Sequence, residues 1–230
     1  MTRIFCDIAD LNLIKKFDRK KIVKGFTTNP TLIRKAGARN YLEYSKKIAK
    51  LTTKPISCEV FADDLDGMIF QGLKINNIGS NIYVKIPVTT SKGKFTGKVI
   101  QELNKKKIKL NITAVYNVIQ VKNILKSINK KISVIISIFA GRMSDTGIDP
   151  TPIIKKSIKL AKNYPNVQIL WASTREAYNY LQAKKLKCHI ITVPPSIITK
   201  IENFGKTSSE LTIDTVKGFL EDSTKSKFKI

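Results

Sequence analysis

The sequence predicts an α/β fold, namely a (β/α)8 TIM barrel with an additional C-terminal helix. Three observations support this prediction: eight short apolar or β-branched runs follow one another, amphipathic stretches of helical spacing separate them, and no glycine-rich dinucleotide fingerprint follows the first run. Such alternation has two usual solutions, an open doubly wound sheet or a closed barrel. Eight units within 230 residues favour the barrel, and the missing fingerprint removes the main argument for the open sheet.

The strands are expected where the chain is briefly apolar or β-branched, because such residues suit a pleated surface that is buried on both faces. In chain order the eight runs are residues 3–8, 25–28, 56–61, 82–86, 109–114, 132–139, 167–172 and 189–193. Side chains two apart in a strand point the same way. Cys6 and Cys58 directly precede acidic residues, so we expect both thiols to point outward into the helix layer.

The stretches between these runs are expected to be helices. Residues 115–128 and 153–161, for example, repeat apolar side chains with helical spacing. Asn29–Pro30 and Asp149–Pro150 are start signals, because each sets a capping side chain before a proline suited to the first helical turn.

An extra helix is predicted after the eighth run. We expect one domain over residues 1–230, with the barrel over about 3–205 and the C-terminal helix over about 208–222. A helix outside a barrel needs somewhere to bury its apolar side chains, here Leu211, Val216, Phe219 and Leu220. The extra helix therefore indicates a homo-oligomer.

The net charge of +25 attracts anionic partners, which include nucleic acid, acidic membranes and phosphorylated substrates. Lysine supplies 36 of the 42 basic residues, and these lysines are spread over helix faces. Nucleic-acid readers usually exploit the fork of arginine. The composition therefore disfavours nucleic acid as a partner, although a non-catalytic basic barrel that binds nucleic acid stays an alternative.

The cysteines and the single histidine form no metal-binding pattern. Cys6, Cys58 and Cys188 are widely spaced and odd in number, and His189 has no second histidine beside it. We expect reduced thiols, no metal and a cytoplasmic location. The sequence also contains no signal peptide and no apolar stretch of membrane-spanning length, so no membrane partner is expected.

Polar residues lie near the C-terminal end of nearly every apolar run or shortly after it, and the active sites of such barrels lie at these ends. They are Asp7, Glu59, Lys85, Asn111, Thr113, Ser137, Arg142, Ser173 and Arg175. Asn111 and Thr113 share a face by parity, as do Ser137 and Phe139, and Ser173 and Arg175 do so if the strand continues past Ala172. We expect this set to converge on one mouth of the barrel.

This combination of side chains suits class I aldol chemistry. Burial disfavours a charged Lys85 and favours the neutral amine, which can attack a carbonyl and form a Schiff base. A carboxylate with a hydroxyl or bound water supplies the proton transfers. A pair of arginines with a nearby serine suits a phosphate.

Six motifs, spread over about residues 3 to 221, resemble the transaldolase family in order and spacing. They are Phe5-Cys6-Asp7, Thr27-Thr28-Asn29-Pro30-Thr31-Leu32, Val84-Lys85-Ile86-Pro87-Val88-Thr89, Asn111-Ile112-Thr113, Phe139-Ala140-Gly141-Arg142 and Ala172-Ser173-Thr174-Arg175. The match is to the short members, which include fructose-6-phosphate aldolases. The resemblance implies the barrel fold, no organic cofactor or metal, and the ring-based decamer typical of short members.

The resemblance also implies a role for each candidate residue. Lys85 would be the Schiff-base lysine, and Asp7 the acid–base carboxylate at the C3 and C4 hydroxyls of the sugar. Glu59 and Thr113 would hold the catalytic water, and Asn29 and Asn111 would bind substrate hydroxyls. Ser137 would contact the C1 end of the substrate. The phosphate would be bound by Arg142, Ser173 and Arg175.

Two positions separate activities within the family. Fructose-6-phosphate aldolases carry glutamine where Glu59 stands and tyrosine where Phe139 stands, and this chain has the transaldolase residue at both. The resemblance therefore implies a transaldolase of the pentose phosphate pathway, which passes a dihydroxyacetone unit from sedoheptulose 7-phosphate or fructose 6-phosphate to an aldose phosphate. An aldolase that releases free dihydroxyacetone is the alternative.

Overall fold

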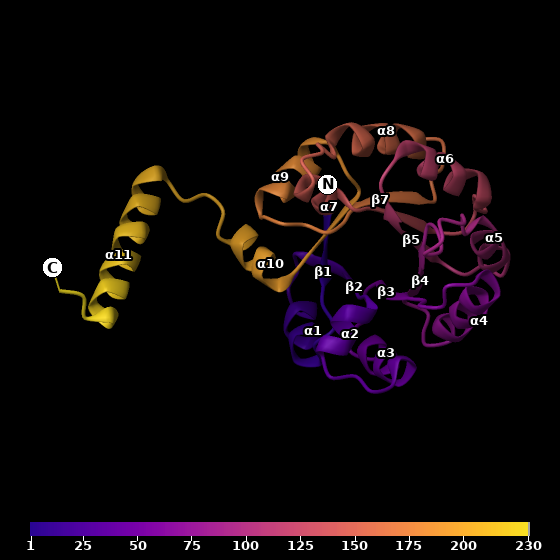
Figure 1. The fold of residues 1–230 in the computed structure, drawn as a ribbon, viewed down its shortest axis with the longest axis horizontal. Helices are drawn as coiled ribbons and strands as arrows, with labels where there is room; N and C mark the ends of the chain where they lie inside the picture. The colour runs from indigo at the N-terminus through magenta and orange to yellow at the C-terminus, as the bar shows by residue number, and fades with distance from the viewer. Residues whose placement is uncertain (230) are drawn as a thin grey trace.

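The computed structural model describes residues 1–229 and contains a closed barrel of parallel strands in chain order (Figure 1). The strands are β1 (Arg3–Asp7), β2 (Val23–Thr27), β3 (Ile56–Glu59), β4 (Ile82–Pro87), β5 (Leu110–Val115), β6 (Val134–Ile138), β7 (Val167–Trp171) and β8 (Ile190–Val193). The barrel closes where β1 pairs with β8, with Arg3 opposite Ile190. The predicted (β/α)8 barrel is confirmed.

Helices surround the barrel and follow its strands (Figure 1). They are α1 (Leu11–Asp18), α2 (Pro30–Lys35), α3 (Tyr41–Ala49), α4 (Leu65–Asn76), α5 (Gly97–Lys105), α6 (Val118–Ser127), α7 (Ala140–Asp145), α8 (Thr151–Ala161), α9 (Tyr178–Lys185) and α10 (Pro195–Glu202). The Asn29 side chain accepts from the Leu32 amide and caps α2, as expected. Asp149 accepts from the Thr151 amide just before α8, so both start signals mark helices.

Several strands end earlier than the sequence indicates. The run 132–139 contains β6, but Phe139 already precedes α7 with φ −82° and ψ 59°. The run 56–61 loses its last residues, because the Phe61 amide donates to the Gln71 side chain instead of to a neighbouring strand. The apolar pattern continues past both strands because Val60 is still buried after β3 and Phe139 packs against buried side chains after β6, whereas Phe61 is exposed.

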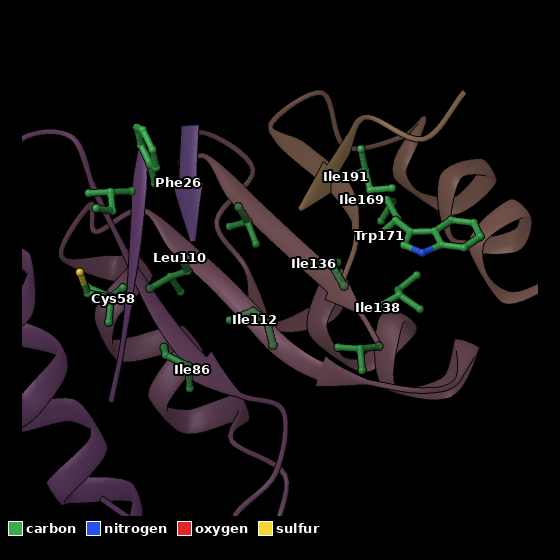
Figure 2. Close-up of a cluster of buried hydrophobic side chains, with 14 of the residues drawn as sticks. Phe26, Cys58, Ile86, Leu110, Ile112, Ile136, Ile138, Ile169, Trp171 and Ile191 are labelled. Atoms are coloured by element: carbon green, nitrogen blue, oxygen red, sulfur yellow. The ribbon is translucent and has the colours of Figure 1, made fainter. Parts of the chain in front are cut away.

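The apolar side chains form an outer layer and an inner cluster. The outer layer lies between strands and helices and contains Cys58, Phe26 and Trp171 (Figure 2). Cys6 is buried in the same layer, as predicted from its parity.

The inner cluster fills the barrel interior and consists of Phe5, Ile135, Leu170, Ala172 and Ile190. A Cβ on residue 25 would lie 2.6 Å from the Phe5 ring, so Gly25 is what lets this ring enter the barrel. The inner cluster is a packed layer of the kind expected inside such barrels.

The C-terminal helix α11 (Ser208–Ser226) stands away from the barrel (Figure 1). A capping box of Thr207 and Glu210 starts it, and it ends four residues beyond the expected boundary. All of its residues are exposed, including Phe219 at 70% and Leu220 at 65%. No helix within residues 1–229 is long and apolar enough to cross a membrane.

Candidate active site

Polar side chains line the inner wall of the barrel above the inner cluster. Parallel pairing puts Glu59 of β3 opposite Lys85 of β4, and Lys85 opposite Asn111 of β5. Asp7, the last residue of β1, pairs with Thr27 at the end of β2. The adjacent strands therefore bring these side chains together at the C-terminal mouth, as the sequence predicts.

Lys85 is the central cation of this wall and is only 7% exposed. Its Nζ lies 3.0 Å from Glu59 Oε2 and donates to the backbone carbonyl of Thr28 at 3.1 Å. The Glu59 amide in turn donates to the Tyr41 hydroxyl at 2.8 Å, which anchors the end of β3. Two acceptors thus hold the amine in one place at the bottom of the mouth.

Asp7 is the second carboxylate of the site and accepts a hydrogen bond from Thr27 Oγ1 at 2.6 Å. Loss of solvent around it raises its pKa above the usual range for aspartate. The positive charge of Lys85 and the Thr27 hydrogen bond oppose this rise in pKa, while the negative charge of Glu59 adds to it. Asp7 is therefore a carboxyl group suited to exchanging a proton.

Asn111 lies beneath the mouth and is completely buried. Its Nδ2 donates to Ser57 Oγ at 2.9 Å, and its Oδ1 accepts from Ser137 Oγ at 2.7 Å. Ser57, which the sequence reasoning did not single out, shares the parity of Glu59, and this parity could have revealed it. This network holds the Ser137 hydroxyl in place. Both polar atoms of the Asn111 side chain take part in it, so the contact of Asn111 with substrate stays a prediction.

Thr113 has a different environment from its neighbour Asn111. Its Oγ1 is buried and has no hydrogen-bond partner within the described residues. The side chain lines the cavity and also borders a hollow shared with Glu59 and Lys85. Its hydroxyl is therefore free to bind a small polar molecule next to the amine.

A cavity of about 120 Å³ opens among these groups. Its lining consists of Asp7, Thr27, Asn29, Lys85, Thr113, Ser137, Phe139, Arg142, Ala172, Ser173 and Thr192. Most of the predicted site residues thus meet in one place. The lining also includes Thr27 and Thr192, which the prediction missed although Thr192 is a polar residue in an apolar run.

The residues expected at the phosphate follow β6 and β7. Arg142 lines both the cavity and an open hollow of about 550 Å³ that also contains Arg175 and Asp145. The condition for a shared face of Ser173 and Arg175, a strand that continues past Ala172, is not met, because β7 ends at Trp171 and Ser173 has a φ of 62°. A turn, rather than a strand, therefore directs these two side chains.

Asp145 occupies one edge of the Arg175 guanidinium. Nε lies 2.9 Å from both carboxylate oxygens of Asp145, Nη2 lies 2.5 Å from Oδ2, and Nη1 donates to the Ser173 carbonyl at 3.0 Å. Arg175 holds the pKa of the Asp145 carboxyl below its usual range. Nη1 and Nη2 therefore each keep one further hydrogen for another acceptor.

Gly141 holds the two loops of this region together. A Cβ at this position would lie 1.6 Å from the carbonyl oxygen of Ser173. The Gly141 amide approaches the Ala172 carbonyl at 3.3 Å. Only a residue without a side chain allows the start of α7 to lie this close to the end of β7.

Phe139 forms an apolar wall beside the cavity. Its ring packs edge to face with Tyr116 at a centroid distance of 5.8 Å. The guanidinium of Arg142 lies 5.3 Å from the ring centroid, a distance typical of a cation–π contact. Phe139 therefore connects the cavity with the arginine side of the site.

The three cysteines and the histidine take no part in this arrangement. Burial raises the pKa of Cys58 to about 11 and that of Cys188 to about 12, and it also raises the pKa of Cys6. His189 Nδ1 accepts from the Ile169 amide at 2.9 Å. The three thiols are structural, because a buried thiol with a raised pKa is a poor nucleophile. His189 is structural as well, since its Nδ1 is bonded to the backbone.

A family model and two relatives are similar to this chain over nearly its whole length. A family model described as Transaldolase/Fructose-6-phosphate aldolase matches residues 4–230. A probable transaldolase of Thermoanaerobacter sp. (strain X514) is 33% identical over 229 residues, which cover 99% of this chain and 100% of the relative. A probable transaldolase of Thermoplasma volcanium is 36% identical over 223 residues, covering 96% and 94%.

Solved structures with low sequence identity share the fold. An orotidine 5'-monophosphate decarboxylase from Metallosphaera sedula superposes with a TM-score of 0.55 at 13% identity, covering 88% of this chain and 95% of that one. A putative dihydrodipicolinate synthase family protein from Coccidioides immitis gives a TM-score of 0.61 at 10% identity, covering 83% and 66%. At such identities the likeness concerns the barrel alone.

Proposed function

This chain belongs to the transaldolase/fructose-6-phosphate aldolase family, and from that premise we propose that it is a transaldolase. It transfers a dihydroxyacetone unit from a ketose phosphate, sedoheptulose 7-phosphate or fructose 6-phosphate, to an aldose phosphate in the cytoplasmic pentose phosphate pathway. The observation that carries the proposal is the buried Lys85, held 3.0 Å from Glu59 in a cavity that Asp7 also lines.

The first step is formation of the imine. Lys85 gives a proton to Glu59, and the free amine adds to the C2 carbonyl of the ketose to form a carbinolamine. Glu59 and Thr113, which border one hollow with Lys85, hold the water that shuttles protons while the carbinolamine loses water. The protonated imine on Lys85 then withdraws electrons from C3, so that no other electron sink is needed.

The second step breaks the bond between C3 and C4. Asp7 accepts the proton of the C4 hydroxyl, the C3–C4 electron pair moves into the imine, and an aldose phosphate leaves. The raised pKa of Asp7 makes it a stronger base for this proton than an ordinary aspartate. The resulting enamine attacks an acceptor aldehyde, Asp7 returns the proton, and hydrolysis of the new imine restores Lys85.

The remaining site residues bind the substrate in this proposal. Asn29 and Ser137 line the cavity beside Lys85 and suit sugar hydroxyls. Arg142 and Ser173 line its far side, and Arg175 borders the adjoining hollow. The phosphate is bound there, with the remaining hydrogens of the Arg175 guanidinium as donors.

Borohydride trapping tests the imine. We expect fructose 6-phosphate with borohydride to add one reduced dihydroxyacetone unit to the intact protein, and peptide mapping to locate it on Lys85. The Lys85→Ala variant should lose both the adduct and turnover, while Lys98→Ala, which removes an exposed lysine that pairs with Asp66, should keep both. Turnover by Lys85→Ala would contradict the proposal.

The second candidate is an aldolase that releases free dihydroxyacetone, since the family description covers both activities. Phe139 disfavours it, because a phenyl ring cannot protonate the enamine or activate water, and the intermediate survives until an acceptor arrives. Product analysis with and without an acceptor aldehyde separates the two candidates. Rapid release of dihydroxyacetone without an acceptor would favour the aldolase.

The assembly is proposed to be a homo-oligomer, with the decamer of the short family members as the expected state. Support comes from α11, whose exposed apolar residues include Leu211, Val216 and Phe219. The helix also carries four acidic and two basic side chains, in a chain with a net charge of +25. An apolar and acidic helix suits the basic surface of a second copy.

A further inference from the structure

Two threonines on either side of β1 meet next to Asp7. β1 pairs with β2 on one side and with β8 on the other. Thr27 of β2 and Thr192 of β8 approach each other with their Oγ1 atoms 2.6 Å apart, and Thr27 Oγ1 lies 2.6 Å from Asp7 Oδ1. These contacts form a chain from Thr192 through Thr27 to Asp7 along the wall of the cavity.

The number of hydrogens fixes the direction of this chain. A threonine hydroxyl has one hydrogen, and an ionised carboxylate only accepts. When Asp7 is ionised, Thr27 therefore donates its hydrogen to Asp7, and Thr192 must donate to Thr27. A hydroxyl that accepts a hydrogen bond becomes a stronger donor itself, so Thr192 strengthens the bond that Asp7 receives.

Thr192 is well placed for such a role. It is 6% exposed, lines the same cavity as Asp7, and its carbonyl accepts from Thr174 Oγ1 at 2.7 Å. Pairing with Phe5 of β1 fixes its backbone, and a β-branched side chain has few rotamers. The hydroxyl therefore has a defined position relative to Thr27.

We propose that Thr192 is a positioning residue for Asp7, which acts through Thr27 to orient the carboxylate and to favour its ionised, proton-accepting form. This inference rests on the proposed function, in which Asp7 takes the proton of the C4 hydroxyl. Thr192 lies in β8, far along the chain from both of its partners, and only closure of the barrel brings it to them.

The charged groups around Asp7 are the same with and without the Thr192 hydroxyl. Inside the barrel, Lys85 and Glu59 act on Asp7 by their charges, and Arg142 lines the same cavity. The Cys6 thiol beside it stays neutral because burial raises its pKa. Outside the barrel, α10 packs against β1, but its Lys200 is exposed and its Glu202 pairs with Lys20. A change in Asp7 on removal of this hydroxyl therefore reports the hydrogen bond alone.

Thr192→Val tests the inference, since valine keeps the shape and removes the donor. Under single-turnover conditions, the acidic limb of the pH profile for fructose 6-phosphate cleavage should move to higher pH by roughly 0.5 to 1 unit, the shift expected for one weakened hydrogen bond to a charged group. Thr192→Ser should restore the wild-type profile. Thr199→Val, which removes an exposed hydroxyl of α10, is the control and should leave the profile unchanged.

A second measurement reads the same quantity without turnover. In a carbon-13 NMR titration of labelled aspartate carboxyl groups, assigned with Asp7→Asn, the midpoint for Asp7 should rise in Thr192→Val and return in Thr192→Ser. A uniform loss of rate without any change of midpoint, or a failure of serine to restore it, would overturn the inference and leave the transaldolase proposal intact. Absence of borohydride adduct and cleavage in the wild type would instead remove the proposed function and the inference together.

Discussion

Single polar side chains inside the barrel decide which chemistry this protein can perform. Each of them takes the place of an apolar residue that would fill the interior, and each has specific partners: Lys85 has Glu59 and the Thr28 carbonyl, and Asp7 has Thr27. Loss of solvent raises the pKa of Asp7, and the charge of Lys85 and the Thr27 hydrogen bond oppose this rise. At this scale the predictions concern one functional group at a time.

Asp7→Asn should separate imine formation from bond cleavage. Asparagine keeps the size of the side chain and cannot accept the C4 proton, so cleavage in a single turnover should slow by roughly 100-fold or more, the usual contribution of a general base. Borohydride trapping on Lys85 should persist. In the wild type, the raised pKa of Asp7 places the acidic loss of activity at a higher pH than for an ordinary aspartate, since the base must be ionised. Cleavage at the wild-type rate by Asp7→Asn would contradict this role.

Asp145→Asn should strengthen phosphate binding. The Asp145 carboxylate shares the Arg175 guanidinium at 2.9 Å and repels an incoming dianion, while asparagine keeps an acceptor oxygen without the charge. We expect a few-fold lower dissociation constant for inorganic phosphate by calorimetry, as for the loss of one exposed charge. Asp66→Asn, which alters an exposed pair with Lys98, changes the net charge equally and should have no effect. Weaker phosphate binding in Asp145→Asn would mean that Asp145 favours phosphate binding by holding Arg175 in place more than it opposes binding by its negative charge.

At the scale of elements, the site depends on loops held at fixed separations by backbone contacts. The start of α7 and the turn after β7 touch through Gly141 and Ser173. The turn itself needs a φ of 62° at Ser173, a conformation that a non-glycine residue adopts only where its surroundings hold it. Arg142 stands at the start of α7 and Arg175 follows the turn after β7. The contact between these two segments therefore sets the distance between the two arginines.

Gly141→Ala should open this contact. The new methyl group would overlap the Ser173 carbonyl at 1.6 Å, and backbone on both sides has to move apart. We expect a lower Tm and a KM for fructose 6-phosphate raised roughly ten-fold or more, because small displacements of positioning groups have large kinetic effects. Gly218→Ala in α11, where an added Cβ meets nothing within 4 Å, should leave the KM unchanged and should not lower the Tm, because alanine is the better helix former. An unchanged KM in Gly141→Ala would show that the arginine positions do not depend on this contact.

The whole molecule combines a basic barrel with the helix α11, whose apolar side chains are exposed within residues 1–229. A net charge of +25 favours encounters with anions over the surface of the molecule. α11 exposes Leu211, Val216, Phe219 and Leu220, and clustered exposed apolar side chains often mark an interface. Burial of this surface against a second copy is the expected solution.

Val216→Asp combined with Phe219→Asp should therefore dissociate the assembly. Two carboxylates on the apolar face would have to be buried unpaired at the interface, which is strongly unfavourable. Sedimentation velocity should show a multiple of 25.9 kDa for the wild type and a smaller species for the double variant. Lys217→Asp makes the same change in net charge on this helix and should retain the wild-type mass. A wild type that sediments as a monomer at micromolar concentration would contradict the proposal.

The sequence alone determined the barrel, the C-terminal helix and most of the cavity lining. Strand parity and apolar periodicity are local properties, so they placed Lys85, Asp7 and Thr113 on the inner wall, and the motif resemblance assigned the family. The short loops were less predictable, and the strand on which a shared face of Ser173 and Arg175 depended does not continue there, because Ser173 has a positive φ.

Only the tertiary structure decided which side chains touch. The contacts of Thr192 with Thr27 and of Asn111 with Ser57 join strands that are distant in the chain, and the pairing of Arg175 with Asp145 joins two loops. No local pattern encodes them, because they depend on the register of each strand pair and on the closure of β8 onto β1. The residues follow from the chain, whereas their hydrogen-bond partners, and with them the proton affinity of Asp7, follow from the closed barrel.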